Sequence, residues 1–134
     1  MELIDYSDYY YRTKLSEPPP PQRMGKFVLL NKYRADEFIV LSPKGFSAYH
    51  ADIVRLFCEQ RGIDGIYSSE HKHFDIHDTH WHVGGGGKWS IDEQLKTLHL
   101  NGYSQAYGRF RTRGLIEKLS MILSLSDYEI TIGS

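Results

Sequence analysis

The chain has 134 residues, of which 40% are hydrophobic and 25% are charged. This length and composition fit one globular domain with its own core, and they exclude a largely disordered chain. Sixteen lysines and arginines against 17 acidic residues give a net charge of −1. Any anion-binding site must therefore be local, and no nucleic-acid partner is predicted. Cys58 is the only cysteine, which excludes an internal disulfide bond and a zinc site built from several cysteines.

The sequence contains no segment that predicts membrane insertion or export. No apolar run approaches the roughly 18 residues of a membrane-spanning helix, and the acidic N-terminus does not resemble a signal peptide. We therefore expect a cytoplasmic protein without a membrane partner, and we take a monomer as the working prediction.

The prolines at 18–21 mark the clearest boundary in the chain. Consecutive prolines cannot donate the hydrogen bonds of a sheet, and they favour an extended conformation. The first sixteen residues are rich in tyrosine but lack clear periodicity. They allow either an added edge strand or a loosely ordered arm, and we predict the arm. The chain then divides into a tyrosine-rich arm with a proline-rich linker at 1–22 and one domain at 23–134.

Short apolar runs predict two neighbouring strands, at residues 26–33 and 36–42, at the start of the domain. Apolar residues then recur with helical spacing. Ser47 is the predicted N-cap of this helix, and Gly62 its predicted C-terminal stop.

The rest of the chain predicts further strands and a second helix. A short strand is expected at 63–69, a strand that turns or bulges at the glycines 84–87, and another strand at 96–102. A helix at 115–125 and a strand at 127–132 complete the chain. The order β-β-α-β-β-β-α-β indicates an α/β or α+β domain with a mixed central sheet of about six strands and two helices.

The stretch NGYSQAYGRF, residues 101–110, joins a predicted strand to a predicted helix. Gly102 permits unusual backbone dihedral angles, and the amides of Ser104, Gln105 and Ala106 could point toward one place at the helix start. Two interpretations stay open: an anion-binding nest of backbone amides, or a plain turn with solvated tyrosines.

His50 falls in the first turn of the first predicted helix, at the border of its apolar face. The positive end of the helix dipole disfavours the imidazolium, so the ring should be neutral near pH 7 and able to act as a general base. The alternative is a half-buried histidine with a structural hydrogen bond. Lys26 opens the first strand of the domain, where a cation could offset phosphate charge or could simply be solvated.

The arginines of RFRTR, Arg109, Arg111 and Arg113, precede the second predicted helix. Cations at a helix start oppose the dipole preference, which favours an anionic partner such as the substrate or an acidic or phosphorylated protein surface. The alternative is a solvated loop that ends near Thr112.

Five of the seven histidines lie within twelve positions: His71, His73, His77, His80 and His82. With Asp75 and Asp78 nearby, binding of zinc, nickel or copper is chemically possible. The segment lacks a recognised metal-binding spacing, and a polar loop or an edge strand is predicted instead.

Several motifs occur together and in one order: KFVLL, YHADI at Tyr49–Ile53, GGGGK, LHLNGYSQAYG and the terminal DYEI. In this order the chain resembles the Janus/Ocnus family, whose best-known members are the small phosphohistidine phosphatases. The resemblance covers about residues 26–132. It implies a phosphohistidine-phosphatase-like fold and a hydrolase that acts without a metal or other cofactor on phosphohistidine in proteins and on related phosphoramidates.

The resemblance also implies roles for individual residues. His50 would be the catalytic residue, as general base or as nucleophile, and Lys26 would contact the substrate. The phosphate would be bound by Ser104, Gln105 and Ala106. The possible accessory residues are Tyr49, Lys88 and Gly102.

The chain departs from the family pattern after the glycine run, where Lys88 stands in place of a common arginine and cannot form a bidentate fork. The histidine-rich segment resembles an insertion before the glycines. Two alternatives to a phosphatase therefore stay open: a phosphate- or phosphopeptide-binding module without efficient turnover, and a metal-binding protein that uses residues 71–82.

Overall fold

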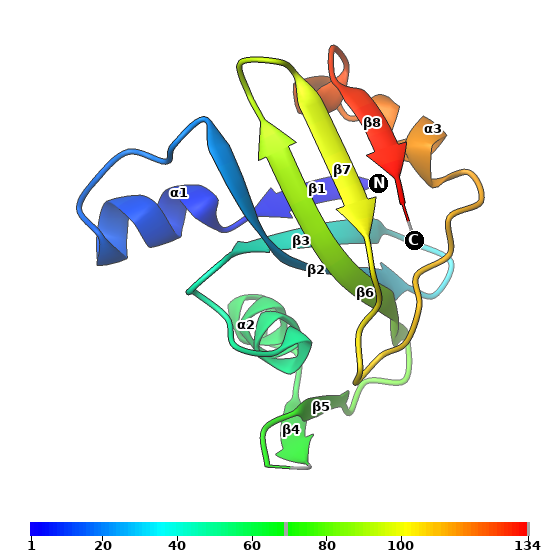
Figure 1. Ribbon diagram of the computed structural model, residues 1–134. Helices are drawn as coiled ribbons and strands as arrows, with labels where there is room; N and C mark the ends of the chain where they lie inside the picture. The colour runs from blue at the N-terminus through cyan, green and yellow to red at the C-terminus, as the bar shows by residue number, and fades with distance from the viewer. Residues whose placement is uncertain (69, 134) are drawn as a thin grey trace.

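A mixed β-sheet forms the centre of the protein (Figure 1). Within residues 1–68 and 70–133, which the computed structural model describes, this sheet has six strands in the order β1-β3-β2-β6-β7-β8. The strands are β1 Glu2–Asp5, β2 Gln22–Lys32, β3 Glu37–Pro43, β6 Trp81–Asp92, β7 Thr97–Asn101 and β8 Glu129–Ile132. The two outermost pairs are parallel and the inner pairs antiparallel. The predicted α+β class with a mixed six-stranded sheet is confirmed.

Short helices and a separate hairpin complete the structure. The helical elements are α1 Ser7–Tyr9 with the π-helical turn Tyr10–Lys14, α2 His50–Arg61, α3 Leu115–Ser120 and the 3₁₀ turn Leu123–Leu125. The hairpin consists of β4 Gly65–Ser68 and β5 His73–Ile76. In the described part of the chain, no helix combines the length and the apolar character that a membrane crossing requires.

The N-cap of helix α2 lies two residues after the predicted one. Tyr49 occupies the N-cap position, and its N–H donates to the Asp52 carboxylate at 3.0 Å. Ser47 instead makes a 2.8 Å hydroxyl–hydroxyl hydrogen bond with Ser42. The stop at Gly62 is as predicted, with a left-handed φ of 66°. As a result, His50 is the first residue of the helix.

Helix α3 is shorter than the predicted 115–125. It ends at Ser120, and the backbone of Ile122 is extended, with a ψ of 125°. This break turns Leu125 into the core, where it is 2% exposed, while Met121 and Leu123 stay at the surface. A continuous helix would have carried Leu125 away from its core contacts, so tertiary packing overrides the local helical pattern.

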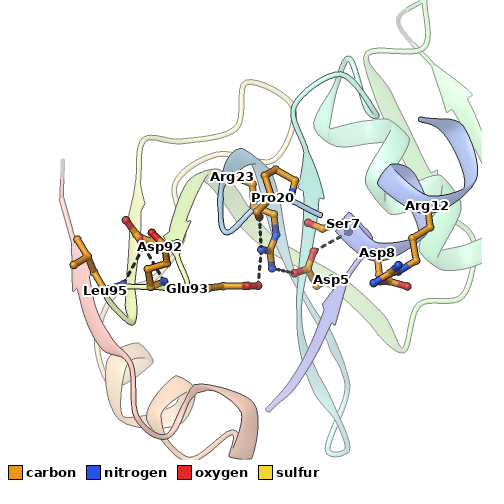
Figure 2. A network of polar contacts seen from close by, with 10 residues as sticks. Asp5, Ser7, Asp8, Arg12, Pro20, Arg23, Asp92, Glu93 and Leu95 are labelled. Atoms are coloured by element: carbon orange, nitrogen blue, oxygen red, sulfur yellow. Dashed lines mark hydrogen bonds and ion pairs between the residues drawn. The ribbon is translucent and has the colours of Figure 1, made fainter. Parts of the chain in front are cut away.

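The arm predicted for the first sixteen residues is wrong, because these residues start with an edge strand, β1, that pairs in parallel with β3. Figure 2 shows the side chain that fastens it. Arg23, only 7% exposed, lies 3.3 Å from the Asp5 carboxylate and 2.6 Å from that of Glu93, and it also donates to the Pro20 carbonyl at 3.1 Å. One guanidinium thus joins the N-terminal strand, the proline segment and the β6–β7 turn.

We expect Arg23→Ala to lower the free energy of unfolding by about 2 kcal/mol, because it removes several charge-assisted hydrogen bonds from a largely buried group. Urea denaturation measures the change. Arg12→Ala is the matched control: its pair with Asp8 is exposed, and its loss should cost at most about 0.5 kcal/mol. Equal effects of the two substitutions would contradict a structural role for Arg23.

The two main helices cover opposite faces of the sheet. Alternate residues of β2 face the two sides: Val28 packs in the cluster that contains Ile53 of α2, whereas Phe27 packs in the cluster that contains Leu119 of α3. Helix α2 contacts β2 and β3, so it covers only part of its face. On that same face, Lys88 of β6 is exposed. This uncovered part of the sheet positions the candidate site.

The glycine run and the histidine-rich segment take different forms. Gly84 and Gly85 form a bulge opposite Leu29 within the continuous strand β6, and Gly85 has a φ of 99°, whereas Gly86 and Gly87 pair in register with Val28 and Phe27. The strand predicted at 63–69 is β4, which pairs with β5 apart from the main sheet; Ser69 lies outside the described residues. Tyr67 fastens this hairpin to α2, because its hydroxyl donates to Asp52 at 2.7 Å and accepts from Arg55 at 2.9 Å.

Candidate functional site

A cleft of about 610 Å³ opens beside the N-terminal end of α2. Most of the residues singled out from the sequence line it: Lys26, Tyr49, His50, Lys88, Gly102, Gln105 and Ala106. The cleft is also lined by four residues that were not predicted for this site: Lys72, His73, Asn101 and Tyr103. Of these, His73 was considered only as a possible metal ligand. Three strands, one helix, the hairpin and one loop thus contribute to a single cavity.

A row of polar residues crosses the sheet at the floor of the cleft. Lys26 of β2 lies directly opposite Lys88 of β6, and Lys88 lies opposite Asn101 of β7. Like charges at directly opposed positions repel each other and destabilise a sheet. Lys72 adds a third ammonium group, and no carboxylate is among the described residues that line the cleft. The cleft is therefore positive in a chain whose net charge is −1, and an anion bound there would offset the repulsion.

His50 has a fixed ring orientation at the start of α2. The residue is 9% exposed, and its Nε2 lies 2.9 Å from the Gly87 carbonyl oxygen. Because a carbonyl oxygen can only accept, Nε2 must carry the hydrogen of the neutral ring, and Nδ1 is then the proton acceptor. A Cβ at Gly86 would lie 3.0 Å from the His50 ring and would collide with the Phe27 carbonyl. Glycine at this position lets the strand approach the imidazole closely.

The surroundings of His50 favour the neutral imidazole. Burial lowers the pKa of His50 below its ordinary value of 6.5, the hydrogen bond with Gly87 opposes this effect, and the charge of Lys26 lowers the pKa further. The direction agrees with the neutral ring expected from the sequence. The main cause differs, because burial rather than the helix dipole makes the largest contribution.

The loop at 102–108 does not sit at the start of a helix as predicted, since α3 begins only at Leu115. It is a self-contained turn. The Ser104 N–H donates to the Gly108 carbonyl at 3.1 Å, the Gly108 N–H donates back to the Ser104 carbonyl at 2.7 Å, and the Ser104 hydroxyl accepts from the Tyr107 N–H at 3.1 Å. The helix dipole therefore adds nothing to this loop.

Within this turn, the three predicted phosphate-binding residues have different positions. Ser104 is 1% exposed, and its amide is already used inside the turn. Gln105 and Ala106 line the cleft, and their amides donate no hydrogen bond to the described part of the chain. Ser104 therefore shapes the turn, while the next two amides are available to an anion.

Tyr107 connects this loop to the β4–β5 hairpin. Its hydroxyl donates to the Phe74 carbonyl at 2.8 Å and accepts from the Phe74 N–H at 3.0 Å. Burial is the main cause that raises the pKa of Tyr107 to about 12, so the phenol keeps its proton. Its ring also packs against His73, with 4.8 Å between the ring centroids. The hairpin thus brings Lys72 and His73 to the cleft, and no signal in the sequence indicates this placement.

The histidine-rich segment is spread over several surroundings. His71 stacks on Tyr67, with ring centroids 4.4 Å apart, and Nδ1 of His80 lies 2.9 Å from the Asp78 carboxylate. Residues 1–68 and 70–133 contain no group of three or more histidine, cysteine or acidic side chains placed to hold a metal ion. The strand β5 accounts for part of the segment, in line with the polar loop or strand expected there.

No protein-family model matches the chain, and no curated protein matches its sequence. The resemblance to the Janus/Ocnus family therefore stays a prediction that rests on the motifs alone.

Proposed function

We propose that this protein is a phosphatase that hydrolyses phosphate bound to nitrogen, as in phosphohistidine of a partner protein, without a metal or other cofactor. The observation that carries the proposal is the placement of His50. Its Nδ1 can accept a proton in a cleft that holds three lysines and two available amides. An anion-binding cleft with a neutral base suits hydrolysis of a phosphoryl group better than binding alone.

The chemistry requires mainly positioning and charge compensation, because a phosphoryl group on nitrogen has a good leaving group. Lys26 and Lys88 would offset the charge of the non-bridging oxygens, and the amides of Gln105 and Ala106 would orient them. A water oxygen attacks phosphorus while His50 Nδ1 takes the water proton. The P–N bond breaks, and a proton on the other nitrogen of the substrate ring allows the imidazole to leave as a neutral molecule.

A covalent route uses the same atoms in a different order. Nδ1 of His50 attacks phosphorus itself, the P–N bond of the substrate breaks, and water then hydrolyses the phosphorylated His50. Rapid alkaline quenching of the enzyme with ³²P-labelled substrate distinguishes the routes, since phosphohistidine survives alkali. Label that stays on the wild type but not on His50→Gln supports the covalent route, and unlabelled protein during turnover supports direct attack by water.

The proposal is tested by phosphate release from a phosphohistidine peptide, measured with a metal chelator present. Phosphoserine and phosphotyrosine peptides are the controls. We expect release from phosphohistidine that exceeds spontaneous hydrolysis and is insensitive to the chelator, and little from the two esters because their leaving groups are poorer. A protein that binds inorganic phosphate but leaves phosphohistidine intact would contradict a phosphatase. It would favour the phosphate-binding module, an alternative supported by Lys88 and by the engaged amide of Ser104.

We expect kcat/KM for phosphohistidine hydrolysis to fall as the pH decreases below 6.5. Since the pKa of folded His50 is lower than 6.5, more than half of the molecules keep Nδ1 unprotonated at that pH, and the base is lost at lower pH. The unfolded chain binds the proton first, so the stability that His50 contributes is also lost as pH falls. The acid limb of kcat/KM measures the loss of the base, and the pH dependence of urea unfolding measures the loss of stability. Both are compared between the wild type and His50→Gln. An acid limb centred above pH 6.5 would be inconsistent with this assignment.

A further inference from the structure

A second groove, with a volume of about 790 Å³, lies where β2 turns into β3. The segment at 109–115, which follows the phosphate-binding loop, forms one of its walls. Six cations line it: Lys32, Arg34, Arg109, Arg111, Arg113 and Lys118. Glu37 is the carboxylate among its described lining residues, and it is already held by Lys118, whose Nζ lies 3.0 and 2.9 Å from the two oxygens. The groove therefore has a large excess of positive charge.

A buried phenylalanine between the first two of these arginines, Arg109 and Arg111, anchors the segment that carries them. Phe110 is 7% exposed and packs edge-on against Phe27, with ring centroids 5.0 Å apart, while the arginines on either side are exposed. They lie before α3 rather than in its first turn, so the helix dipole does not explain them. None of them lies within 4 Å of a carboxylate among residues 1–68 and 70–133, and neither does Lys32 or Arg34.

We propose that this groove docks an acidic, extended peptide segment of a partner protein. Exposed guanidinium groups without carboxylate partners bind carboxylates through paired hydrogen bonds. Alternate residues of an extended peptide are separated by about 6.5 Å and lie on the same side, so acidic residues at alternate positions can face Arg109 and Arg111, which both line the groove. Leu29, Val83 and Leu115 add apolar lining that a side chain between the acids can contact. A peptide is favoured over nucleic acid because the chain as a whole carries a net charge of −1.

The groove lies close enough to the cleft for one substrate to occupy both. The role in substrate selection that follows from this rests on the proposed function. Lys26 lines the cleft and Leu30 lines the groove, four residues farther along β2, which corresponds to about 13 Å. The chain at 102–113 lines both. A substrate with phosphohistidine in the cleft would thus place a residue at least about four positions away in the groove. An acidic segment at that spacing would determine which phosphohistidine is chosen.

Fluorescence anisotropy with a short peptide of alternating glutamates, free of histidine and phosphate, tests the docking site. We expect binding that weakens with salt, and Arg109→Gln/Arg111→Gln/Arg113→Gln should raise the Kd by at least about tenfold. The matched control, Arg12→Gln/Lys14→Gln/Lys44→Gln, removes the same charge elsewhere. Equal weakening in both variants, no binding by the wild type, or tighter binding of a single-stranded oligonucleotide that displaces the peptide would each overturn the proposal.

Hydrolysis assays test the docking site and the proposed phosphatase activity independently of each other. The groove variant should retain wild-type phosphate release from a small phosphoramidate, but its kcat/KM for a phosphohistidine peptide with the acidic segment should drop about tenfold. If the groove binds acidic peptide while no phosphoramidate is hydrolysed, the docking site stands and the phosphatase fails. If hydrolysis is intact and the acidic segment has no effect in any variant, the selection role is overturned.

Discussion

Replacing His50 by alanine should reduce phosphohistidine hydrolysis by a factor of about 10³ or more, whether the ring acts as base or as nucleophile. The ring is the group in the cleft that combines a fixed orientation with an unprotonated nitrogen at neutral pH. Because the side chain is largely buried, alanine also leaves a cavity. His50→Gln is therefore the sharper variant: its amide can still donate to the Gly87 carbonyl, but it cannot accept a proton in place of Nδ1.

Initial rates of phosphate release and urea denaturation are measured for both variants. His99→Gln is the control, since His99 lies on β7 outside the cleft and makes a 2.7 Å hydrogen bond with Thr131. We expect both His50 variants to lose turnover, the glutamine variant to unfold close to the wild type, and His99→Gln to keep its activity. Wild-type turnover in His50→Gln would remove His50 from the reaction.

The main part of the fold could be predicted because its elements carry strong local patterns. Strands β2 and β3 contain apolar runs of strand length, β7 alternates apolar and polar residues, and α2 combines helical spacing with a glycine stop. The edge strand β1 has no such pattern, because a short strand at the rim of a sheet is only partly buried. Its place depends on the contacts of Arg23 with Asp5 and Glu93, which lie 18 and 70 positions away. Periodicity in the sequence does not predict contacts between residues so far apart in the chain.

Residues of the candidate site could be predicted from the sequence only where their position within one helix or strand was enough to suggest a role. His50 at a helix start is of that kind. Lys26 was expected to open its strand, but β2 begins at Gln22, so Lys26 lies inside the strand. The opposition of Lys26 and Lys88 depends on strand register, and the arrival of Lys72 and His73 depends on the hairpin that Tyr107 holds. The helix dipole was a wrong reason for expecting an anion-binding loop at 102–108, because α3 begins only at Leu115, well after this loop ends.

Because Lys26 and Lys88 lie opposite each other, we expect a second large effect on activity when Lys26 is replaced. Lys26→Gln should lower kcat/KM for phosphohistidine by about 10²-fold, because it removes a positive charge aimed at oxygens whose charge grows in the transition state. The same substitution removes a like-charge pair across β2 and β6, so the free energy of unfolding should stay the same or rise by a few tenths of a kcal/mol. Loss of activity together with equal or higher stability is the pattern of a residue retained for function at a cost to the fold.

The variant Lys88→Gln tests whether the two lysines compensate the phosphate charge together or whether one of them has a separate role. If the pair acts as one electrostatic unit, the second substitution made in the background of the first should cost less activity than it does in the wild type, and a double-mutant cycle measures the difference. Lys44→Gln is the control, because this lysine is exposed and does not line the cleft. A Lys26→Gln variant that unfolds more easily and loses activity only in proportion to the unfolded fraction would mean that Lys26 supports the sheet. The positive floor of the cleft would then have no part in binding phosphate.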